Sequence, residues 1–311
     1  MQTERLTIAL TDGRTVEVLA LGPPGGLPLV VHHGTPGGGL VPYEPTSEIA
    51  IGHGLRVIHF ARPGYSRSSP RPGRRVANVA GDVAEILDAL GAETFVTHGT
   101  SGGGPHALAC AYLLPGRCLA AASIAGVAPR DAEGLDWLAG MGPENIEEFA
   151  AAESSPADLT AFLEKEAGAL GAVTGGDIIA GLGGLIDDAD KAVLTGEFAD
   201  YRAAALRAAV ARGIAGWYED DMAFASDWGF DLGPDSAPVT GVPDPGDGPA
   251  PIAVWQGDQD RMVPFSHGQW LAAHLPGTRV HLLPGEGHIS LEHHHYNDIL
   301  TDLLDLAGIR S

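Results

Sequence analysis

The sequence predicts an α/β protein with a doubly wound, mostly parallel sheet that is interrupted by a helical cap. Short apolar runs rich in strand-forming residues alternate with helically spaced segments near both ends of the chain. Between them, residues 129–228 are rich in Ala, Glu and Asp, with helical spacing and almost no strand-like run. We therefore expect one sheet domain, formed by residues 1–128 and 229–311, and a cap formed by residues 129–228.

The sheet domain begins with an expected antiparallel hairpin. Its strands are Thr7–Leu10 and Thr15–Leu21, which flank turn residues at positions 11–13. The next apolar runs show little alternation, as strands buried on both faces should, and their ranges are Leu27–His32, Leu55–Phe60, Thr94–Thr97 and Leu119–Ile124. Helical spacing of apolar residues predicts helices at Val76–Leu90 and Gly103–Leu114. Strands and helices that alternate in this order imply parallel, right-handed crossovers.

The same alternation returns after the cap. Residues Gly233–Pro251 are dense in Pro, Gly and Asp, which excludes a helix or a central strand and predicts an exposed connector. The chain then continues through an expected strand Ile252–Gln256, helix Phe265–Leu275, strand Arg279–Leu283 and amphipathic helix Leu291–Leu306. These elements complete the sheet domain.

The charge of the chain excludes several classes of partner. Eighteen Lys and Arg against 40 Asp and Glu give a formal net charge of −22, which would repel nucleic acids and anionic membranes. No apolar run approaches the ~20 residues that span a bilayer. Because carboxylates are dense in the cap and the connector, the expected partner is a neutral or weakly cationic small molecule. A homo-oligomer is compatible with the sequence.

The cysteines and the N-terminal residues favour a cytoplasmic protein. Cys110 and Cys118 form no C-x-x-C pair, so neither a disulfide framework nor a thiolate zinc site is expected. Residues Met1–Arg5 do not lead into the apolar stretch that an export signal needs.

The sharpest local pattern surrounds Ser101. Residues Gly99–Gly103 fit G-x-S-x-G and lie between an expected strand and an expected helix. A sharp turn there projects the serine hydroxyl outward, and the small flanking residues let neighbouring backbones approach. The N-terminus of the following helix stabilises a developing negative charge. Ser101 is therefore the predicted nucleophile.

Two other kinds of site, a dinucleotide site and a metal site, are not supported because the required residues are not at the required spacing. Residues Gly102–Ala107 also satisfy the dinucleotide pattern G-x-G-x-x-G/A, but no acidic residue for the ribose follows at Ala121–Val127, so no cofactor is expected. Adjacent side chains at positions 293–295, all His, do not share one face of a helix, so no metal site is expected. These histidines are interpreted as a solvated helix start.

A nucleophilic serine needs a base and a group that orients the base. In an open α/β sheet such groups gather beyond the carboxyl ends of the strands. Asp260 and His288 both lie in loops that follow expected strands, which predicts Asp260 as the acid and His288 as the base. Asp258 is an alternative acid two residues away. Glu286 is close to His288 in sequence, but adjacency along a loop gives poor geometry, and it is interpreted as exposed.

With these residues, the chain resembles the α/β-hydrolase superfamily, in its capped branch of esterase-like and proline-iminopeptidase-like enzymes. The H-G-x-P of the family is similar to His33–Pro36, its acid motif G-x-x-D-x-x-V-P to Gly257–Pro264, and its terminal G-H to Gly287 and His288. The resemblance implies that the backbone N–H groups of Thr35 and Gly102 form an oxyanion hole. It also implies the chain order nucleophile, acid, base.

The chain departs from the family pattern in two turns. The family turn D-x-x-G-x-G-x-S is represented by Ala61–Ser68, which lacks the first Asp and the middle Gly. The peptidase subgroup carries H-G-G-P-G, and here Thr35 replaces the second Gly. The second departure favours an ester over an amide substrate. Other histidines are expected near the site: His32 and His33 at the oxyanion loop, and His98 and His106 on either side of the Ser101 turn. They are interpreted as packing residues rather than proton shuttles.

These observations predict a cofactor-independent serine hydrolase of carboxylic esters, lactones or thioesters. A proline-iminopeptidase-like aminopeptidase and a ligand-binding protein without turnover are the alternatives. Substrate contacts are expected from the cap, with Trp217, Met222 and Trp228 as candidate pocket residues. The adjacent carboxylates at positions 219–221 are interpreted as solvated cap surface, with recognition of a substrate amine as the alternative.

Overall fold

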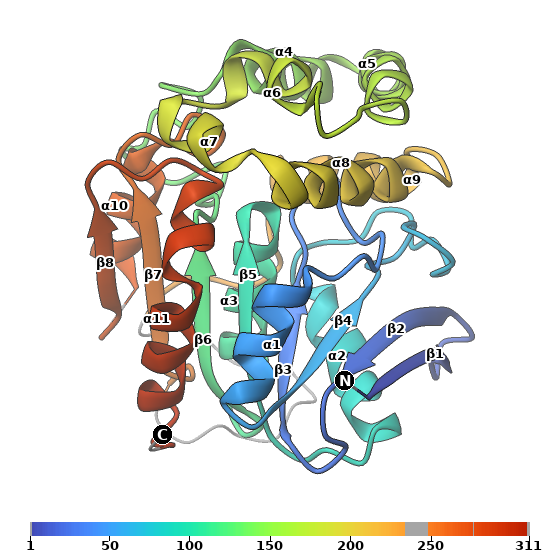
Figure 1. Ribbon diagram of the computed structural model, residues 1–311, viewed down its shortest axis with the longest axis vertical. Helices are drawn as coiled ribbons and strands as arrows, with labels where there is room; N and C mark the ends of the chain where they lie inside the picture. Colours follow the sequence, from blue (N-terminus) through green and yellow to red (C-terminus); the bar gives the residue numbers. More distant parts are fainter. Residues whose placement is uncertain (1, 234–247, 276, 310–311) are drawn as a thin grey trace.

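A computed structural model describes residues 2–233, 248–275 and 277–309 of the protein. Eight strands form one sheet in the order β1-β2-β4-β3-β5-β6-β7-β8 (Figure 1). Their bounds are β1 Thr3–Ala9, β2 Thr15–Leu21, β3 Leu27–His32, β4 Leu55–Phe60, β5 Phe95–Thr100, β6 Cys118–Ile124, β7 Ile252–Gly257 and β8 Arg279–Leu283. The pairs β1–β2 and β2–β4 are antiparallel, and all other neighbours are parallel. The expected fold class is confirmed.

Helices cover both faces of the sheet. On one face lie α1 (Glu44–Gly52) and α11 (Ser290–Leu306), and on the other lie α2 (Asn78–Ala89), α3 (Gly104–Leu113) and α10 (Phe265–His274). Each face buries its own apolar cluster, because the strands between them are apolar on both sides. The sheet is thus the middle layer of three, which fixes the carboxyl ends of its parallel strands at one edge.

Helix α1 is the main element that the sequence pattern did not predict. Its buried residues include the small Ser47 and Ala50, so the segment carries no strong apolar stripe at helical spacing. Strand β5 continues to Thr100, three residues beyond the expected end, and so reaches Ser101 directly. Most of the predicted connector Gly233–Pro251 lies outside the described residues.

The segment between β6 and β7 contributes the helices above the sheet, which we call the cap. They are α4 (Pro143–Ser154), α5 (Pro156–Leu170), α6 (Ile178–Leu182), α7 (Asp188–Val193), α8 (Gly196–Val210) and α9 (Ala215–Phe224). In Figure 1 they lie over the carboxyl ends of the parallel strands. A separate apolar cluster in the cap also takes in Ile289, from the loop before α11. The domain boundaries stay a prediction.

Two expectations from composition have structural counterparts. Across residues 2–233, 248–275 and 277–309, no helix is both long and apolar enough to cross a bilayer. Cys110 and Cys118 are free and buried, and burial raises the pKa of both thiols. Neither cysteine is therefore poised to react as a thiolate.

Candidate active site

Ser101 occupies a strained turn between β5 and α3. Its φ is +59°, a left-handed conformation that non-glycine residues adopt only when the surroundings enforce it. The neighbouring glycines make this tight turn possible. A Cβ on Gly99 would lie 2.0 Å from the carbonyl oxygen of Gly103, and a Cβ on Gly103 would lie 2.2 Å from the carbonyl oxygen of His32. The predicted motif glycines are thus needed for close backbone contact at the turn.

Ser101 lines a cavity of about 430 Å³ between the sheet and the cap. His288 and Thr35 line the same cavity, so the structure brings the predicted nucleophile, base and one predicted oxyanion donor together. Ser101 lies in the turn after β5, Thr35 in the β3–α1 loop and His288 in the β8–α11 loop, so all three follow the carboxyl end of a parallel strand. The cavity is the place where a substrate would meet them.

The ring of His288 is held by Asp260. The Nδ1 atom of His288 lies 2.8 Å from Oδ2 of Asp260. Asp260 is itself fixed by Gln256 Nε2 at 3.0 Å and by the backbone N–H groups of Met262 and Val263 at 2.9 Å and 2.8 Å. Because a carboxylate only accepts, Nδ1 carries the proton and Nε2 is left as the basic nitrogen.

Charge around His288 favours its protonated form. Burial lowers the pKa of His288, but the carboxylate of Asp260, assisted by that of Asp190, outweighs burial and raises it above the usual value near 6.5. The cap supplies Asp190, on α7. Its carboxylate accepts the backbone N–H groups of His288, Ile289 and Ser290 at 3.1 Å, 2.7 Å and 2.9 Å. The cap therefore fixes the backbone that carries His288.

The two rival carboxylates are engaged elsewhere. Asp258 is exposed, and its Oδ1 accepts the side-chain amide of Gln259 and the backbone N–H of Gly285. Glu286 accepts Ser290 Oγ at 2.6 Å and also contacts His294 and His295. The expectation that Glu286 is exposed was wrong, because it pairs with the first turns of α11, and its side chain is only 14% exposed. Neither carboxylate is bonded to the ring of His288.

Thr35 and Gly102 lie against each other beside Ser101. A Cβ on Gly102 would come within 2.5 Å of Thr35 Oγ1, so the side chain at 102 must be absent for this contact. Gly34 also packs on Ser101, since a Cβ on Gly34 would lie 3.4 Å from Ser101 Cβ. The structure therefore brings both predicted oxyanion donors to the nucleophile.

With this geometry in view, the comparison with known families decides the family. Residues 28–294 match the family described as alpha/beta hydrolase fold. The chain belongs to this family. A curated relative, the non-heme chloroperoxidase of Streptomyces lividans, is 34% identical over 148 residues, which are 47% of this chain and 53% of that protein. The chain thus matches about half the length of that relative.

Several solved structures share the fold over nearly the whole chain. An esterase from Thermogutta terrifontis is 18% identical, with 99% of both chains covered and a TM-score of 0.66. An esterase from Exiguobacterium antarcticum is 16% identical, with 97% of this chain and 100% of that chain covered and a TM-score of 0.63. A bromoperoxidase from Bacillus anthracis is 21% identical, with the same coverage and a TM-score of 0.62. At these identities the likeness is one of fold.

One of the three candidate pocket residues faces the α/β-hydrolase cavity. Trp217 lines it, and its Nε1 donates to Glu148 Oε1 at 2.6 Å. Met222 and Trp228 are not among the lining residues. Met222 lies five positions after Trp217 on α9, about 140° around the helix, and packs in the core. Trp228 is buried against Phe230, with ring centroids 6.0 Å apart. These two predictions were wrong.

Part of the cavity wall is an aromatic cluster that was not predicted. Tyr43, before α1, stacks on Tyr201 of α8 with centroids 4.7 Å apart, and Phe198 lies beside both rings. All three line the cavity. The spacing of Phe198 and Tyr201, three apart, was a signal for a shared helix face.

Two carboxylates of the cap that were expected on the surface are buried. Asp220 and Asp221 on α9 are 0% and 1% exposed. Asp221 is hydrogen-bonded to the carboxyl group of Glu148, which lines the cavity. Burial raises the pKa of Glu148 to about 7, and burial together with Glu148 raises that of Asp221 well above its usual range. The pair therefore shares a proton around neutral pH.

This pair makes a prediction about stability. A carboxyl whose pKa is raised in the folded state stabilises the fold at low pH and loses that contribution as pH rises through about 7. Glu148→Gln removes the titration while keeping an acceptor for Trp217 and adding a donor for Asp221. We expect the Tm of the wild-type protein to fall by roughly 2 °C or more relative to this variant between about pH 4.5, the ordinary pKa of a glutamate, and about pH 7, and to change little beyond that; scanning calorimetry measures this. The control is Glu147→Gln, on the exposed side of α4, whose Tm should change with pH as that of the wild type does. If the curves of Tm against pH were parallel for all three proteins, the shared proton would be contradicted.

Of the predicted packing histidines, His32, His98 and His106 are buried and His33 is half-buried. Burial lowers the pKa of His32, His33 and His106 well below the usual range and that of His98 to about 3, so all four rings are neutral. The histidines at positions 293–295 lie inside α11 rather than before it. Among the described residues, no group of three or more His, Cys, Asp or Glu side chains is arranged to hold a metal ion.

Proposed function

We propose that the protein is a serine hydrolase of carboxylic esters that works through an acyl-enzyme. Ser101 Oγ attacks the acyl carbon and its proton passes to Nε2 of His288. The N–H groups of Thr35 and Gly102 stabilise the oxyanion, and His288 then protonates the leaving alkoxide. In the second half, His288 takes a proton from water, hydroxide attacks the acyl carbon, and Ser101 regains its proton as the acid leaves.

One observation carries the proposal. Ser101 is held at φ +59° in a cavity that it shares with His288, whose other ring nitrogen is bonded to Asp260 at 2.8 Å. A strained serine that shares a cavity with an oriented imidazole is the arrangement that nucleophilic acyl transfer requires. The direct test is reaction with a fluorophosphonate, followed by mass mapping of the labelled peptide. The expected adduct is on Ser101, and labelling elsewhere, or none, would refute the mechanism.

The charge around His288 predicts the pH dependence. Only the neutral imidazole accepts the serine proton, and the pKa of His288 is raised above 6.5 by Asp260. We therefore expect kcat/KM for a neutral ester to rise with pH and to level off only above about pH 7. A profile from about pH 5 to pH 9 with a non-ionising substrate measures this. Full activity retained well below pH 6.5 would show that another group is the base.

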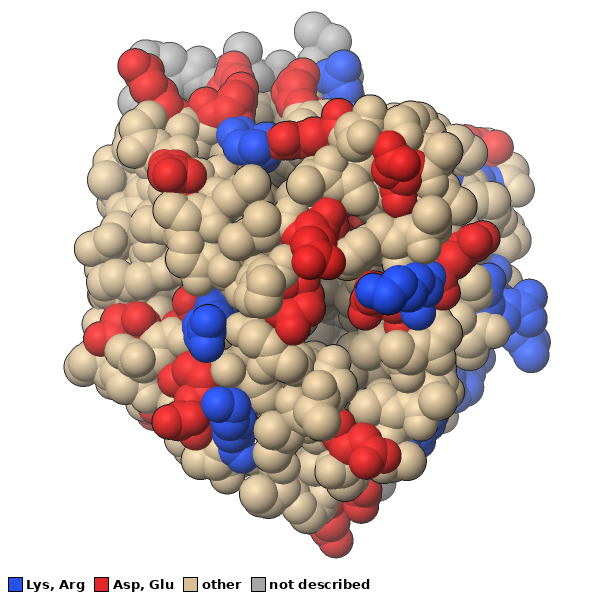
Figure 2. Space-filling model, turned by 90° about the horizontal axis from the view of Figure 1, so that it is seen from above, with Lys and Arg blue, Asp and Glu red and all other residues tan. Residues whose placement is uncertain are grey.

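The walls of the cavity support a neutral or cationic substrate. Four glutamates line it, Glu144, Glu148, Glu166 and Glu292, against Arg202 as the one Lys or Arg among the lining residues. From above, Asp and Glu side chains outnumber Lys and Arg over the cap face (Figure 2). We compare a neutral ester, p-nitrophenyl butyrate, with an anionic one, the p-nitrophenyl monoester of glutaric acid. At low salt, we expect kcat/KM for the neutral ester to be about tenfold higher, and we expect this ratio to shrink as the salt concentration rises. Equal values at low salt would contradict this.

The same glutamates favour one alternative, an aminopeptidase that binds a substrate amine. All four already have partners. Glu148 accepts Trp217 Nε1 and is hydrogen-bonded to Asp221, as described above. The other three are Glu144, which accepts the N–H of Gly184, Glu166, which pairs with Lys165, and Glu292, which accepts Thr100 Oγ1. Because these carboxylates are already bonded, they are less available to bind a substrate amine, which favours an ester substrate over an amide with a free amine. Hydrolysis of prolyl p-nitroanilide faster than of short p-nitrophenyl esters would decide for the peptidase, and binding without single-turnover cleavage would decide for a ligand-binding protein.

A further inference from the structure

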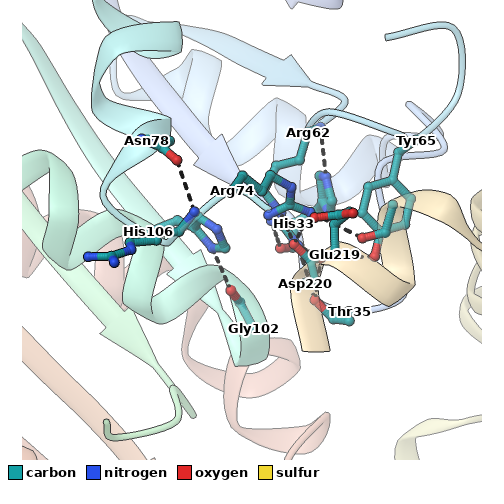
Figure 3. A network of polar contacts seen from close by, with 12 residues as sticks. His33, Thr35, Arg62, Tyr65, Arg74, Asn78, Gly102, His106, Glu219 and Asp220 are labelled. Atoms are coloured by element: carbon teal, nitrogen blue, oxygen red, sulfur yellow. Dashed lines mark hydrogen bonds and ion pairs between the residues drawn. The ribbon is translucent and has the colours of Figure 1, made fainter. Parts of the chain in front are cut away.

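Asp220 is a buried carboxylate of the cap that reaches into the sheet domain. It lies on α9, is 0% exposed, and accepts hydrogen bonds from four side chains (Figure 3). Thr35 Oγ1 and Tyr65 Oη donate at 2.7 Å and 2.8 Å. Arg62 donates through Nε at 3.1 Å and Nη2 at 2.6 Å, and Arg74 through Nη2 at 2.6 Å. One carboxylate thus gathers the β3–α1 and β4–α2 loops.

The charges in this cluster are matched only while Asp220 is ionised. Burial by itself raises the pKa of Asp220, but the guanidinium groups of Arg62 and Arg74 outweigh burial and hold the pKa well below its usual range. Both arginine side chains are nearly buried, at 1% and 3% exposed. Removing the charge of Asp220 would leave two buried cations without their counter-ion, which favours a rearrangement of Arg62.

Arg62 in turn holds the loop that carries Thr35. Its Nη1 donates to the carbonyl of His33, and its Nη2 donates to the carbonyl of Gly34 at 3.0 Å and to Thr35 Oγ1 at 3.1 Å. The backbone N–H of Arg62 donates to His33 Nε2, so the proton of that ring is on Nδ1, which donates to the same Gly34 carbonyl at 2.8 Å. Two donors therefore fix the Gly34 carbonyl.

The direction of this carbonyl sets the direction of the Thr35 amide. In a trans peptide the C=O of one residue and the N–H of the next point in opposite directions. With the Gly34 carbonyl turned to Arg62, the N–H of Thr35 points away from Arg62. Gly34 packs on Ser101, and both line the cavity with Thr35. The hydrogen bonds of Arg62 therefore aim the amide that we assign to the oxyanion hole.

We infer that Asp220 is a positioning residue of the reaction: through Arg62 and the hydroxyl of Thr35, this cap carboxylate holds the Thr35 N–H toward the substrate oxyanion. The inference rests on the proposed function. It makes the cap part of the catalytic machinery rather than only a wall of the pocket.

Two variants test the inference. Asp220→Asn removes the charge at nearly constant shape, and Thr35→Val removes the hydroxyl while keeping the amide. Loss of an oxyanion donor costs about 10²–10³ in rate, so a misdirected donor should lower kcat for p-nitrophenyl butyrate about 10–100-fold, with KM changed by less than about threefold. The inhibition constant of a trifluoromethyl ketone, which forms a hemiketal oxyanion with the serine, should rise by a similar factor.

Controls separate positioning from folding. Each kcat is calculated from the concentration of reactive serine, which is titrated with a fluorophosphonate. A variant that is only partly folded therefore does not give a falsely low kcat. Asp227→Asn, the same change at an exposed residue paired with Arg75, should match the wild type within about twofold. Thr35→Ser restores the hydroxyl and should recover most of the loss of Thr35→Val. If Asp220→Asn does not fold, the Thr35 pair gives the answer.

The outcomes of failure are distinct. Normal kcat per serine and normal ketone inhibition in both variants, whatever their Tm, would reduce Asp220 to a purely structural role and overturn the inference. Full ester turnover by a protein that lacks the Ser101 hydroxyl would overturn the proposed function instead.

Discussion

Replacing Ser101 by alanine is expected to lower kcat for p-nitrophenyl butyrate by roughly 10³–10⁶-fold, because no acyl-enzyme can form. The residual rate would come from the oxyanion donors Thr35 and Gly102, which still polarise a bound ester for attack by water. Fluorophosphonate labelling should disappear in parallel. Binding of the ester should change little, because the cavity walls, formed by both the cap and the sheet domain, remain in place.

A matched control is available for this variant. Ser226→Ala makes the same chemical change at an exposed serine beyond the end of α9, whose hydroxyl donates to the carbonyl of Met222. It should retain kcat within about twofold. The Tm of Ser101→Ala should not fall below that of the wild type, since the change removes one oxygen from a half-buried residue that lines the cavity and leaves the turn otherwise unchanged. If Ser101→Ala keeps more than about a tenth of the wild-type kcat, another residue is the nucleophile.

The sheet was predictable because its signals are local. Strands β2, β3, β4 and β8 have the expected bounds, since each is a short apolar run bordered by turn residues. The turn at Ser101 was also predictable from the sequence, because the glycines that allow its close backbone contacts lie within two residues of Ser101. Helix α1 carried no such signal, since its buried side is made of small residues.

The buried carboxylates of the cap could not be predicted in the same way. Asp220 pairs with Arg62 and Arg74, which are 158 and 146 residues away in sequence. A run of three acidic residues is usually a solvated surface, and nothing local distinguishes an exception. The pocket residues failed for a related reason: Trp217 and Met222 share a helix, but which side of α9 meets the cavity depends on how the cap docks.

The choice between Asp260 and Asp258 gives the second large effect. Asp260→Asn should lower kcat for ester hydrolysis by about 10³–10⁴-fold, because Asn can donate to Nδ1 of His288 and so favour the tautomer whose Nε2 carries the proton. The base would then be blocked at the atom that faces the substrate. The pKa of His288 should also fall, because the carboxylate of Asp260 is what raises it against burial.

Asp258→Asn is the matched control, since the same change two residues away removes an exposed carboxylate that bonds Gln259 and Gly285. It should keep kcat within about twofold of the wild type. The two variants together also report on the pH profile: the residual activity of Asp260→Asn should level off at a lower pH than that of Asp258→Asn. Equal losses in both variants would show that the loop, rather than the bond from His288 to Asp260, is what the reaction needs.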